Sequence, residues 1–167
     1  MPMRQAPAAF AGRDHDHAAC GDDAIASAEA ICRERAERLT PLRRRVLELV
    51  WRSHEPVGAY DLLAALRKDG RSGAPPTVYR ALDFLLEQGF VHRIQSLNAF
   101  VGCNHPGESH AGQFLICRRC RSAAELHDAE VSKAVADGAG RIGFRVLSQT
   151  VEIAGLCPAC QAAEKKR

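Results

Sequence analysis

The chain has 167 residues, of which 46% are hydrophobic and 26% charged, with a formal net charge of +3. This length accommodates one medium domain or two small ones, and no apolar run approaches the roughly 20 residues of a membrane-spanning helix. The N-terminus lacks the basic flank and sustained apolar stretch of a secretory signal, so we expect a cytoplasmic protein. The mildly basic charge permits nucleic-acid binding without requiring it.

The N-terminal part of the chain carries a tail followed by helical patterns. Residues 1–23 mix Ala, Pro, Gly, Asp and His without periodicity, which predicts a disordered tail. Apolar residues at helical spacing then predict a first helix within residues 27–39. A second helix is expected from Pro41, with Thr40 as its N-cap. The arginine run at residues 43–45 inside this helix is interpreted as a solvated face, with phosphate contact as the alternative.

Two more helices and a hairpin follow. Segments 59–70 and 75–90 each show an apolar stripe at helical spacing, and two β-prone runs around a turn-like SLNA lie within residues 90–103. This order of elements predicts a winged helix-turn-helix, which we expect to occupy residues 24–102. The residues expected to face its core are Val46, Leu47, Val50, Trp51, Leu62, Leu63, Leu66, Val78, Ala81, Leu82 and Leu85.

The helix expected in segment 75–90 would read DNA. In a helix-turn-helix the second helix lies in the major groove, with its N-terminal residues at base edges. At that end stand Thr77, Tyr79 and Arg80, whose side chains can bond a guanine edge, hold a phosphate or contact a thymine methyl. Tyr60, at the start of the preceding helix, is placed to touch the DNA backbone or an adjacent base. The alternative is an ordinary amphipathic helix with a solvated face.

A second, smaller domain is predicted beyond the hairpin. Residues 103–112 are polar and contain Pro and Gly, which indicates a hinge or linker before a domain at residues 113–167. A mixture of strands and one helix predicts a small α+β domain there, which gains stability from a metal or from dimerisation. Its expected elements are a strand at residues 113–117, a second around 122–126, a helix from Asp128 to about Gly138, and a long strand within 144–157.

Two Cys-x-x-Cys motifs lie in this second domain. The chain has seven cysteines, an odd number that cannot pair completely, and a reducing compartment leaves thiolates free to bind metal. Two such motifs together complete a tetrahedron of Zn–S bonds about 2.3 Å long, with redox use as the alternative. We therefore expect a structural zinc site at Cys117, Cys120, Cys157 and Cys160.

A closed site of four cysteines makes a poor sensor, so a second group of potential metal ligands is of interest. These residues are spread over the hairpin, the linker and the start of the second domain. A site assembled from such parts would close only when the parts come together, and would then fix the angle between domains. The candidates are His92, Cys103, His105, His110 and Glu125.

Five stretches of the sequence together resemble the Fur family of metal-sensing repressors, and especially its zinc-uptake branch: RLTPLR, AYDLL, PPTVYRALDFLLEQGFVHR, FLICRRC and GLCPAC. The resemblance runs from about Ser27 to Cys160. It implies a homodimeric, zinc-dependent transcriptional repressor that binds palindromic operators of zinc-uptake genes in double-stranded DNA. It also implies an N-terminal winged helix, a C-terminal dimerisation domain and a structural zinc held only by cysteines.

The same resemblance implies a regulatory zinc site, and hence two zinc ions per subunit. One thiolate, two imidazoles and one carboxylate would suit Zn(II). His105 competes with His110 for one position, and His127 is interpreted as lying outside the site, with a weaker third site as the alternative. The ligands carried over by position are His92 directly after GFV, Cys103 at the end of the wing, His110 seven residues before the first cysteine motif, and Glu125 five residues past it.

Three other functions fit the sequence less well. An iron or peroxide sensor of the same family would usually show a His-rich run before the first cysteine motif, where this chain has only His105 and His110. A zinc enzyme would need an open coordination position, and the chain has neither H-E-x-x-H nor a phosphate-binding loop. A zinc-stabilised interaction module would have no use for outward-facing Thr77, Tyr79 and Arg80. A DNA-binding regulator, not an enzyme, is therefore expected.

Overall fold

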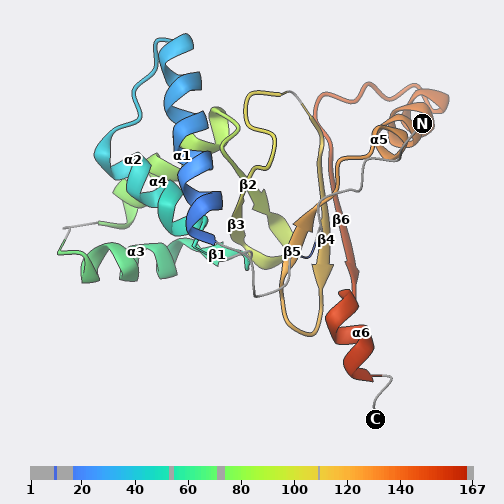
Figure 1. Ribbon diagram of the computed structural model, residues 1–167. Helices are drawn as coiled ribbons and strands as arrows, with labels where there is room; N and C mark the ends of the chain where they lie inside the picture. The colour runs from blue at the N-terminus through green and yellow to red at the C-terminus, as the bar shows by residue number, and fades with distance from the viewer. Residues whose placement is uncertain (1–9, 11–16, 53–54, 71–73, 109, 165–167) are drawn as a thin grey trace. The chain divides into compact units, whose positions relative to one another are not determined.

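The computed structural model describes residues 10, 17–52, 55–70, 74–108 and 110–164. They divide into two compact units, the first within residues 11–108 and the second made of Phe10 together with residues within 109–167. Each unit contains a three-stranded sheet (Figure 1). None of the helices within these described stretches is both long and apolar enough to span a membrane.

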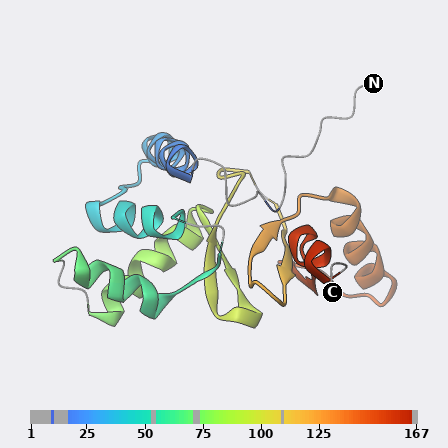
Figure 2. The same ribbon diagram turned by 60° about the horizontal axis from the view of Figure 1, so that its bottom comes forward.

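The first unit is a winged helix-turn-helix. Helices α2, α3 and α4 pack against one another and α1 packs against α2 (Figure 2), and the hairpin of β2 and β3 follows α4. This order confirms the fold expected from the sequence. The elements are α1 (His17–Glu34), α2 (Pro41–Val50), β1 (Val57–Gly58), α3 (Ala59–Lys68), α4 (Pro75–Glu87), β2 (Val91–Ile94), the 3-10 turn η1 (Gln95–Leu97) and β3 (Ala99–Gly102).

The start of α1 corrects the sequence-based boundary of the tail. Residues 17–23, expected to be disordered, form the first turns of this helix, and the rest of the expected tail lies outside the described residues apart from Phe10. The buried side chains of α1 are Ile25, Ala28 and Cys32, so its apolar stripe is short. Residues 17–23 contain no large aliphatic or aromatic residue, so no apolar stripe marked them as helical in the sequence.

The core of the first unit consists of the apolar stripes that the sequence predicted. Thr40 caps α2 by accepting a hydrogen bond from the Arg43 backbone N–H at 3.4 Å, and Pro41 is the first helical residue. Of the residues expected inside, Trp51 is only partly buried. The others are all buried: Val46, Leu47, Val50, Leu62, Leu63, Leu66, Val78, Ala81, Leu82 and Leu85.

The arginine run in α2 contacts other parts of the same unit. The Arg43 guanidinium lies 3.5 Å from the ring centroid of Phe84 in α4, within reach of a cation–π interaction. The other two arginines pair with carboxylates: Arg44 with Glu29 and Glu48, and Arg45 with Glu48 and Asp69. These arginines therefore tie α2 to α1, α3 and α4, in addition to covering a solvated face.

A small antiparallel sheet ends the first unit. Its strand order is β1-β3-β2, so the two-residue strand β1, which the sequence did not reveal, adds an edge to the expected hairpin. In the β2–β3 pair, His92 lies opposite Val101 and Val91 opposite Gly102. Asn98 adopts a left-handed conformation with φ 47° between η1 and β3, in agreement with the turn expected around SLNA.

The second unit is a small α+β domain. Its sheet has the order β5-β4-β6, with β4 antiparallel to β5 and parallel to β6. The parallel pair requires a crossover, and α5 lies in that connection. Asp128 caps α5 through hydrogen bonds from the backbone N–H groups of Glu130 and Val131. The elements are β4 (Gly112–Cys117), β5 (Ala123–Glu125), α5 (Ala129–Arg141), β6 (Thr150–Gly155) and α6 (Pro158–Glu164).

The last strand is shorter than the sequence predicted. We expected a long strand within residues 144–157, but β6 spans Thr150–Gly155. The β-prone residues that precede it have no ladder partner, because the β4–β6 register begins where Gly112 faces Thr150. Pairing, and not local propensity, sets the start of this strand.

The N-cap of α2 allows a direct test of the local sequence signal. Replacing Thr40 with Ala removes the side-chain acceptor at the helix start and should lower the free energy of unfolding by about 1 kcal/mol. Replacing Thr40 with Ser keeps the hydroxyl and should leave stability nearly unchanged. Denaturant unfolding of the zinc-loaded protein compares the three proteins. Equal stability of the Ala variant and the parent would show that this cap contributes nothing.

Candidate metal centre and nucleic-acid interface

The four cysteines of the two motifs meet at one end of the sheet in the second unit. Cys117 is the last residue of β4 and Cys120 lies in the turn toward β5, while Cys157 immediately precedes α6 and Cys160 lies within it. The first turn is held by hydrogen bonds from the N–H of Cys117 to the Ser122 carbonyl and from Arg121 N–H to the Cys117 carbonyl, both 2.9 Å.

The sulfur atoms have the spacing that a tetrahedral zinc site needs. All four Sγ atoms lie within 4.8 Å of one another, and Cys120 Sγ is 3.7 Å from Cys157 Sγ. A tetrahedron with Zn–S bonds of about 2.3 Å has sulfur–sulfur edges of about 3.8 Å. The cluster therefore fits a closed structural zinc site, as the sequence predicted. Four protein ligands would fill the tetrahedral coordination sphere and leave no open coordination position for a substrate.

The environment of these thiols favours deprotonation of some and not of others. Although burial acts to raise the pKa of Cys117, backbone hydrogen bonds from Cys120 and Cys157 lower it to about 6. The Ser122 hydroxyl, 3.0 Å from Cys120 Sγ, lowers the pKa of Cys120. Burial, together with the neighbouring sulfur atoms, raises the pKa of Cys160 to about 12. Four thiolates this close repel one another, and a divalent cation supplies the charge that offsets this repulsion.

In the first unit, the hairpin positions His92 and Cys103 on one face. His92 pairs across the sheet with Val101, and Cys103 follows two residues later, so the two side chains are diagonal neighbours on the same side of the pleat. The Cys103 backbone N–H donates to the Phe90 carbonyl at 3.0 Å, which continues the hairpin pairing one step beyond the strands. Both residues are thus presented by backbone that is paired across the hairpin.

In the second unit, His110 precedes β4 and lies beside Glu125, the last residue of β5. His110 Nε2 lies 2.7 Å from Glu125 Oε1, and Glu125 ends β5 opposite Phe114 of β4. The ring of His127 is 5.7 Å from that of His110, measured between centroids. His105 belongs to the first unit, where it is exposed. The sequence placed His110 and Glu125 in one donor set, and within this unit they are adjacent.

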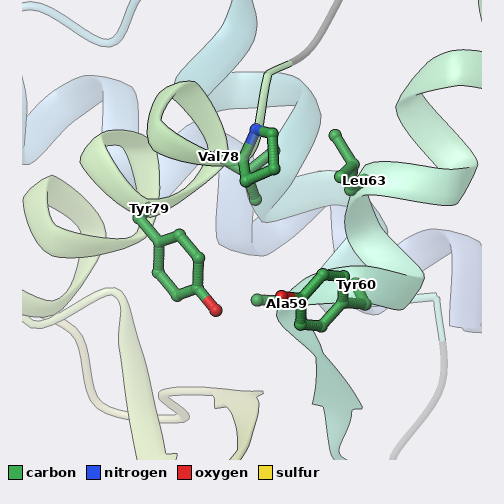
Figure 3. A pocket seen from close by; sticks show the side chains of 6 residues that line it. Ala59, Tyr60, Leu63, Val78 and Tyr79 are labelled. Carbon is green, nitrogen blue, oxygen red and sulfur yellow. The ribbon is translucent and has the colours of Figure 1, made fainter.

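The residues proposed to read DNA lie at the starts of α3 and α4. Tyr60 is 74% exposed and Tyr79 42% exposed, Arg80 is exposed, and Thr77 is half-buried. The two tyrosines stand on either side of a small apolar groove (Figure 3). Sequence reasoning assigned Leu63 and Val78 only to the core and so missed that they also form part of this groove. The groove is lined by Ala59, Tyr60, Leu63, Pro75, Val78 and Tyr79.

The fold and the cluster together define a winged-helix protein with a structural metal site. Residues 34–154 match the model of the Ferric uptake regulator family. The chain is 42% identical over 144 residues to the zinc uptake regulation protein of Escherichia coli (strain K12), covering 86% of this chain and 84% of that protein. The chain belongs to the Ferric uptake regulator family.

Solved structures agree with this assignment. A zinc uptake regulator complexed with zinc and DNA has a TM-score of 0.82 and 41% identity, covering 87% of this chain and 97% of its own. A crystal structure of holo XcZur has a TM-score of 0.78 and 47% identity, covering 84% of this chain and 99% of its own. A curated zinc uptake regulation protein of Mycobacterium tuberculosis (strain CDC 1551 / Oshkosh) is 33% identical over 107 residues, covering 62% of this chain and 79% of that protein.

The cysteine cluster predicts distinct behaviour for cysteines inside and outside it. Replacing Cys117 with Ser removes one thiolate of the closed site. The variant should no longer retain the tightly held zinc, and its second unit should no longer fold cooperatively. Replacing Cys20, which lies in α1, with Ser is the matched control and should leave zinc content unchanged. Metal analysis after dialysis against a mild chelator measures both. Full zinc retention by the Cys117 variant would contradict the assignment of this ligand.

Proposed function

We propose that this protein is a zinc-responsive transcriptional repressor whose zinc-loaded homodimer binds palindromic operators of zinc-uptake genes. The observation that carries this proposal is the four-thiolate cluster in a winged-helix chain that is 42% identical to a zinc uptake regulation protein. The solved relative complexed with both zinc and DNA supports it further. Such a repressor acts in the cytoplasm, which agrees with the expectation from the sequence.

DNA binding is assigned to the N-terminal turn of α4 and the start of α3. Arg80 is exposed on the helix that a helix-turn-helix inserts into the major groove, where a guanidinium can bond a guanine edge bidentately. The exposed rings of Tyr60 and Tyr79 can contact bases or the sugar–phosphate backbone. Thr77, on the first turn of the helix, is suited to a phosphate.

Regulation is assigned to a second zinc site with the ligands His92, Cys103, His110 and Glu125, giving two zinc ions per subunit. One observation in each unit supports this donor set. His92 and Cys103 share one face of the hairpin, and His110 and Glu125 are 2.7 Å apart in the second unit. A mixed thiolate, imidazole and carboxylate set at tetrahedral geometry suits Zn(II) better than Mn(II) or Mg(II).

Homodimerisation is assigned to the second unit. Its strand order leaves β6 at an edge of the sheet, and an unpaired edge is a ready surface for another chain. Large apolar side chains around α5 and β6 are exposed, with Ile142 at 83% and Leu147 at 82%. Apolar surface of this kind is typical of an interaction site. The other exposed large apolar residues in this unit are Val135, Phe144, Ile153 and Leu156.

The regulatory mechanism rests on preorganisation. With zinc bound, the four ligands hold the hairpin and the second unit in one arrangement, so that DNA binding does not have to order them. A coupling of about 1 to 3 kcal/mol, typical of allosteric systems, changes operator affinity roughly 5- to 150-fold. Linkage is reciprocal, so operator DNA tightens regulatory zinc by the same factor.

The main alternative is an iron or peroxide sensor of the same family, which would differ only in the regulatory metal. A measurement of operator binding at fixed salt, across buffered free Zn(II), Fe(II) and Mn(II), distinguishes the two. The protein should carry its structural zinc throughout. Tight binding only with Zn(II) supports the proposal, whereas equal activation by Fe(II) would favour an iron sensor, and binding indifferent to metal would leave a protein whose zinc merely holds its shape.

Cys103 separates the regulatory site from the structural one. Replacing Cys103 with Ser should leave a folded dimer with one tightly bound zinc per subunit, but its operator affinity should no longer rise with free zinc. Replacing Cys32, which is also buried in the first unit, with Ser is the matched control and should keep the zinc response. Fluorescence anisotropy with operator DNA, paired with sedimentation, reports both properties. An unfolded or monomeric Cys103 variant would contradict this assignment.

Arg80 tests the recognition helix. Replacing Arg80 with Ala should weaken specific binding by about 1 to 3 kcal/mol and remove the preference for one base pair, because a bidentate contact to a base edge is lost. Replacing Arg67, an exposed arginine in the last turn of α3, with Ala serves as a comparison. Equal weakening on every sequence by the Arg80 variant would instead indicate a phosphate contact.

A further inference from the structure

Trp51 lies directly against the backbone of Gly102. A Cβ atom built on Gly102 would stand 2.2 Å from Trp51 Cε2, 2.5 Å from Nε1 and 2.6 Å from Cζ2. Non-bonded atoms essentially never come this close, so no residue other than glycine fits here while the indole keeps its place. The ring of Trp51 therefore covers the strand at the last residue of β3.

This contact falls between the two regulatory ligands of the first unit. Val101, which precedes Gly102, pairs with His92 across the hairpin. Cys103 follows Gly102 directly, and its N–H bonds to the Phe90 carbonyl. A displacement of the Gly102 backbone would therefore move Cys103 and alter its position relative to His92.

Trp51 also belongs to the helical core. It is the C-cap residue of α2, where its backbone N–H donates to the Leu47 carbonyl at 3.1 Å. Helix α2 packs against α4, which carries the residues assigned to DNA, and against β3. The Trp51 side chain thus links β3, which is directly followed by the proposed ligand Cys103, to α2, the helix that supports the recognition helix.

The indole N–H is not what keeps tryptophan here. Trp51 Nε1 is buried and has no hydrogen-bond partner among the described residues. An unpaired buried donor opposes stability, and a purely apolar ring would avoid that cost. The ring's extent over Gly102 is the feature that a smaller side chain would lose.

We propose that Trp51 is a positioning residue for the regulatory metal, acting by clamping the Gly102 backbone so that Cys103 and His92 are held in the geometry that zinc requires. This inference rests on the proposed regulatory site. Ligands that are already ordered bind metal more tightly than ligands that the metal must order. Trp51 is the C-cap residue of α2, and α2 packs against α4. A movement of the hairpin would therefore be transmitted through Trp51 and α2 to the recognition helix α4.

The experiment is a double-mutant cycle between positions 51 and 102, measured on the protein with structural zinc in place. Replacing Gly102 with Ala should force the indole and the strand apart and weaken regulatory zinc binding at least tenfold in a competition titration with a zinc chelator. Replacing Trp51 with Leu should weaken it less. In the double variant the new methyl group has space. The Gly102→Ala change should therefore weaken zinc binding much less in the Trp51→Leu background than in the parent protein.

Matched controls separate positioning from general stability. Gly140 in α5 has open space around a built Cβ atom, so Gly140→Ala should change neither zinc affinity nor operator binding. Trp51→Phe keeps an aromatic ring and should retain more zinc affinity than Trp51→Leu. Folding and structural zinc content are measured for every variant, because a merely structural role would lower stability and leave the zinc affinity of the folded protein unchanged.

The chain contains a single tryptophan, so tryptophan fluorescence reports the surroundings of Trp51. Emission of Trp51 should change as regulatory zinc binds, with the same midpoint as operator binding, and Cys103→Ser should abolish the change. Normal zinc binding without any change in emission, together with additive effects at positions 51 and 102, would overturn the positioning role and leave the proposed function standing. Absence of a second zinc in the parent protein would overturn both.

Discussion

The parallel pairing of β4 with β6 is the constraint on which the metal centre depends. It places Cys117 opposite Gly155, so that the turn after β4 and the start of α6 emerge at the same end of the sheet. Cysteines that are distant in the sequence then meet within 4.8 Å. A parallel pair cannot close through a short turn, and the crossover through α5 is therefore as necessary to the cluster as the cysteines themselves.

The cluster and the sheet support each other. A domain as small as the second unit is marginal as an isolated core, and zinc held by all four thiolates would join the turn after β4 to the start of α6. The environment lowers the pKa of Cys117 and raises that of Cys160, so the four thiols are not equally easy to deprotonate. Such a site stabilises a fold, and its closure makes it unsuited to sensing.

Sequence patterns predicted the elements that local chemistry determines. Thr40 and Pro41 marked the start of α2, and leucine spacing identified the core, because caps and helical stripes depend on neighbouring residues. The two-residue strand β1 and the late start of β6 depend on partners far along the chain, and were missed or misplaced. The contact of Arg43 with Phe84 and that of Trp51 with Gly102 likewise join separate elements, so no local sequence pattern predicts them.

The proposed division of metal chemistry between a structural and a regulatory site is consistent with these constraints. A sensor must gain or lose its ion over the range of free metal in the cell, so its ligands need to be only partly organised before binding. The proposed regulatory ligands come from short strands and their ends, in contrast to the tightly held cysteine turns. The hairpin holds His92 and Cys103 on one face, and in the second unit His110 Nε2 lies 2.7 Å from Glu125 Oε1. In the proposed mechanism, zinc would order these two pairs of ligands relative to each other, and a metal-dependent repressor would use that step as its switch.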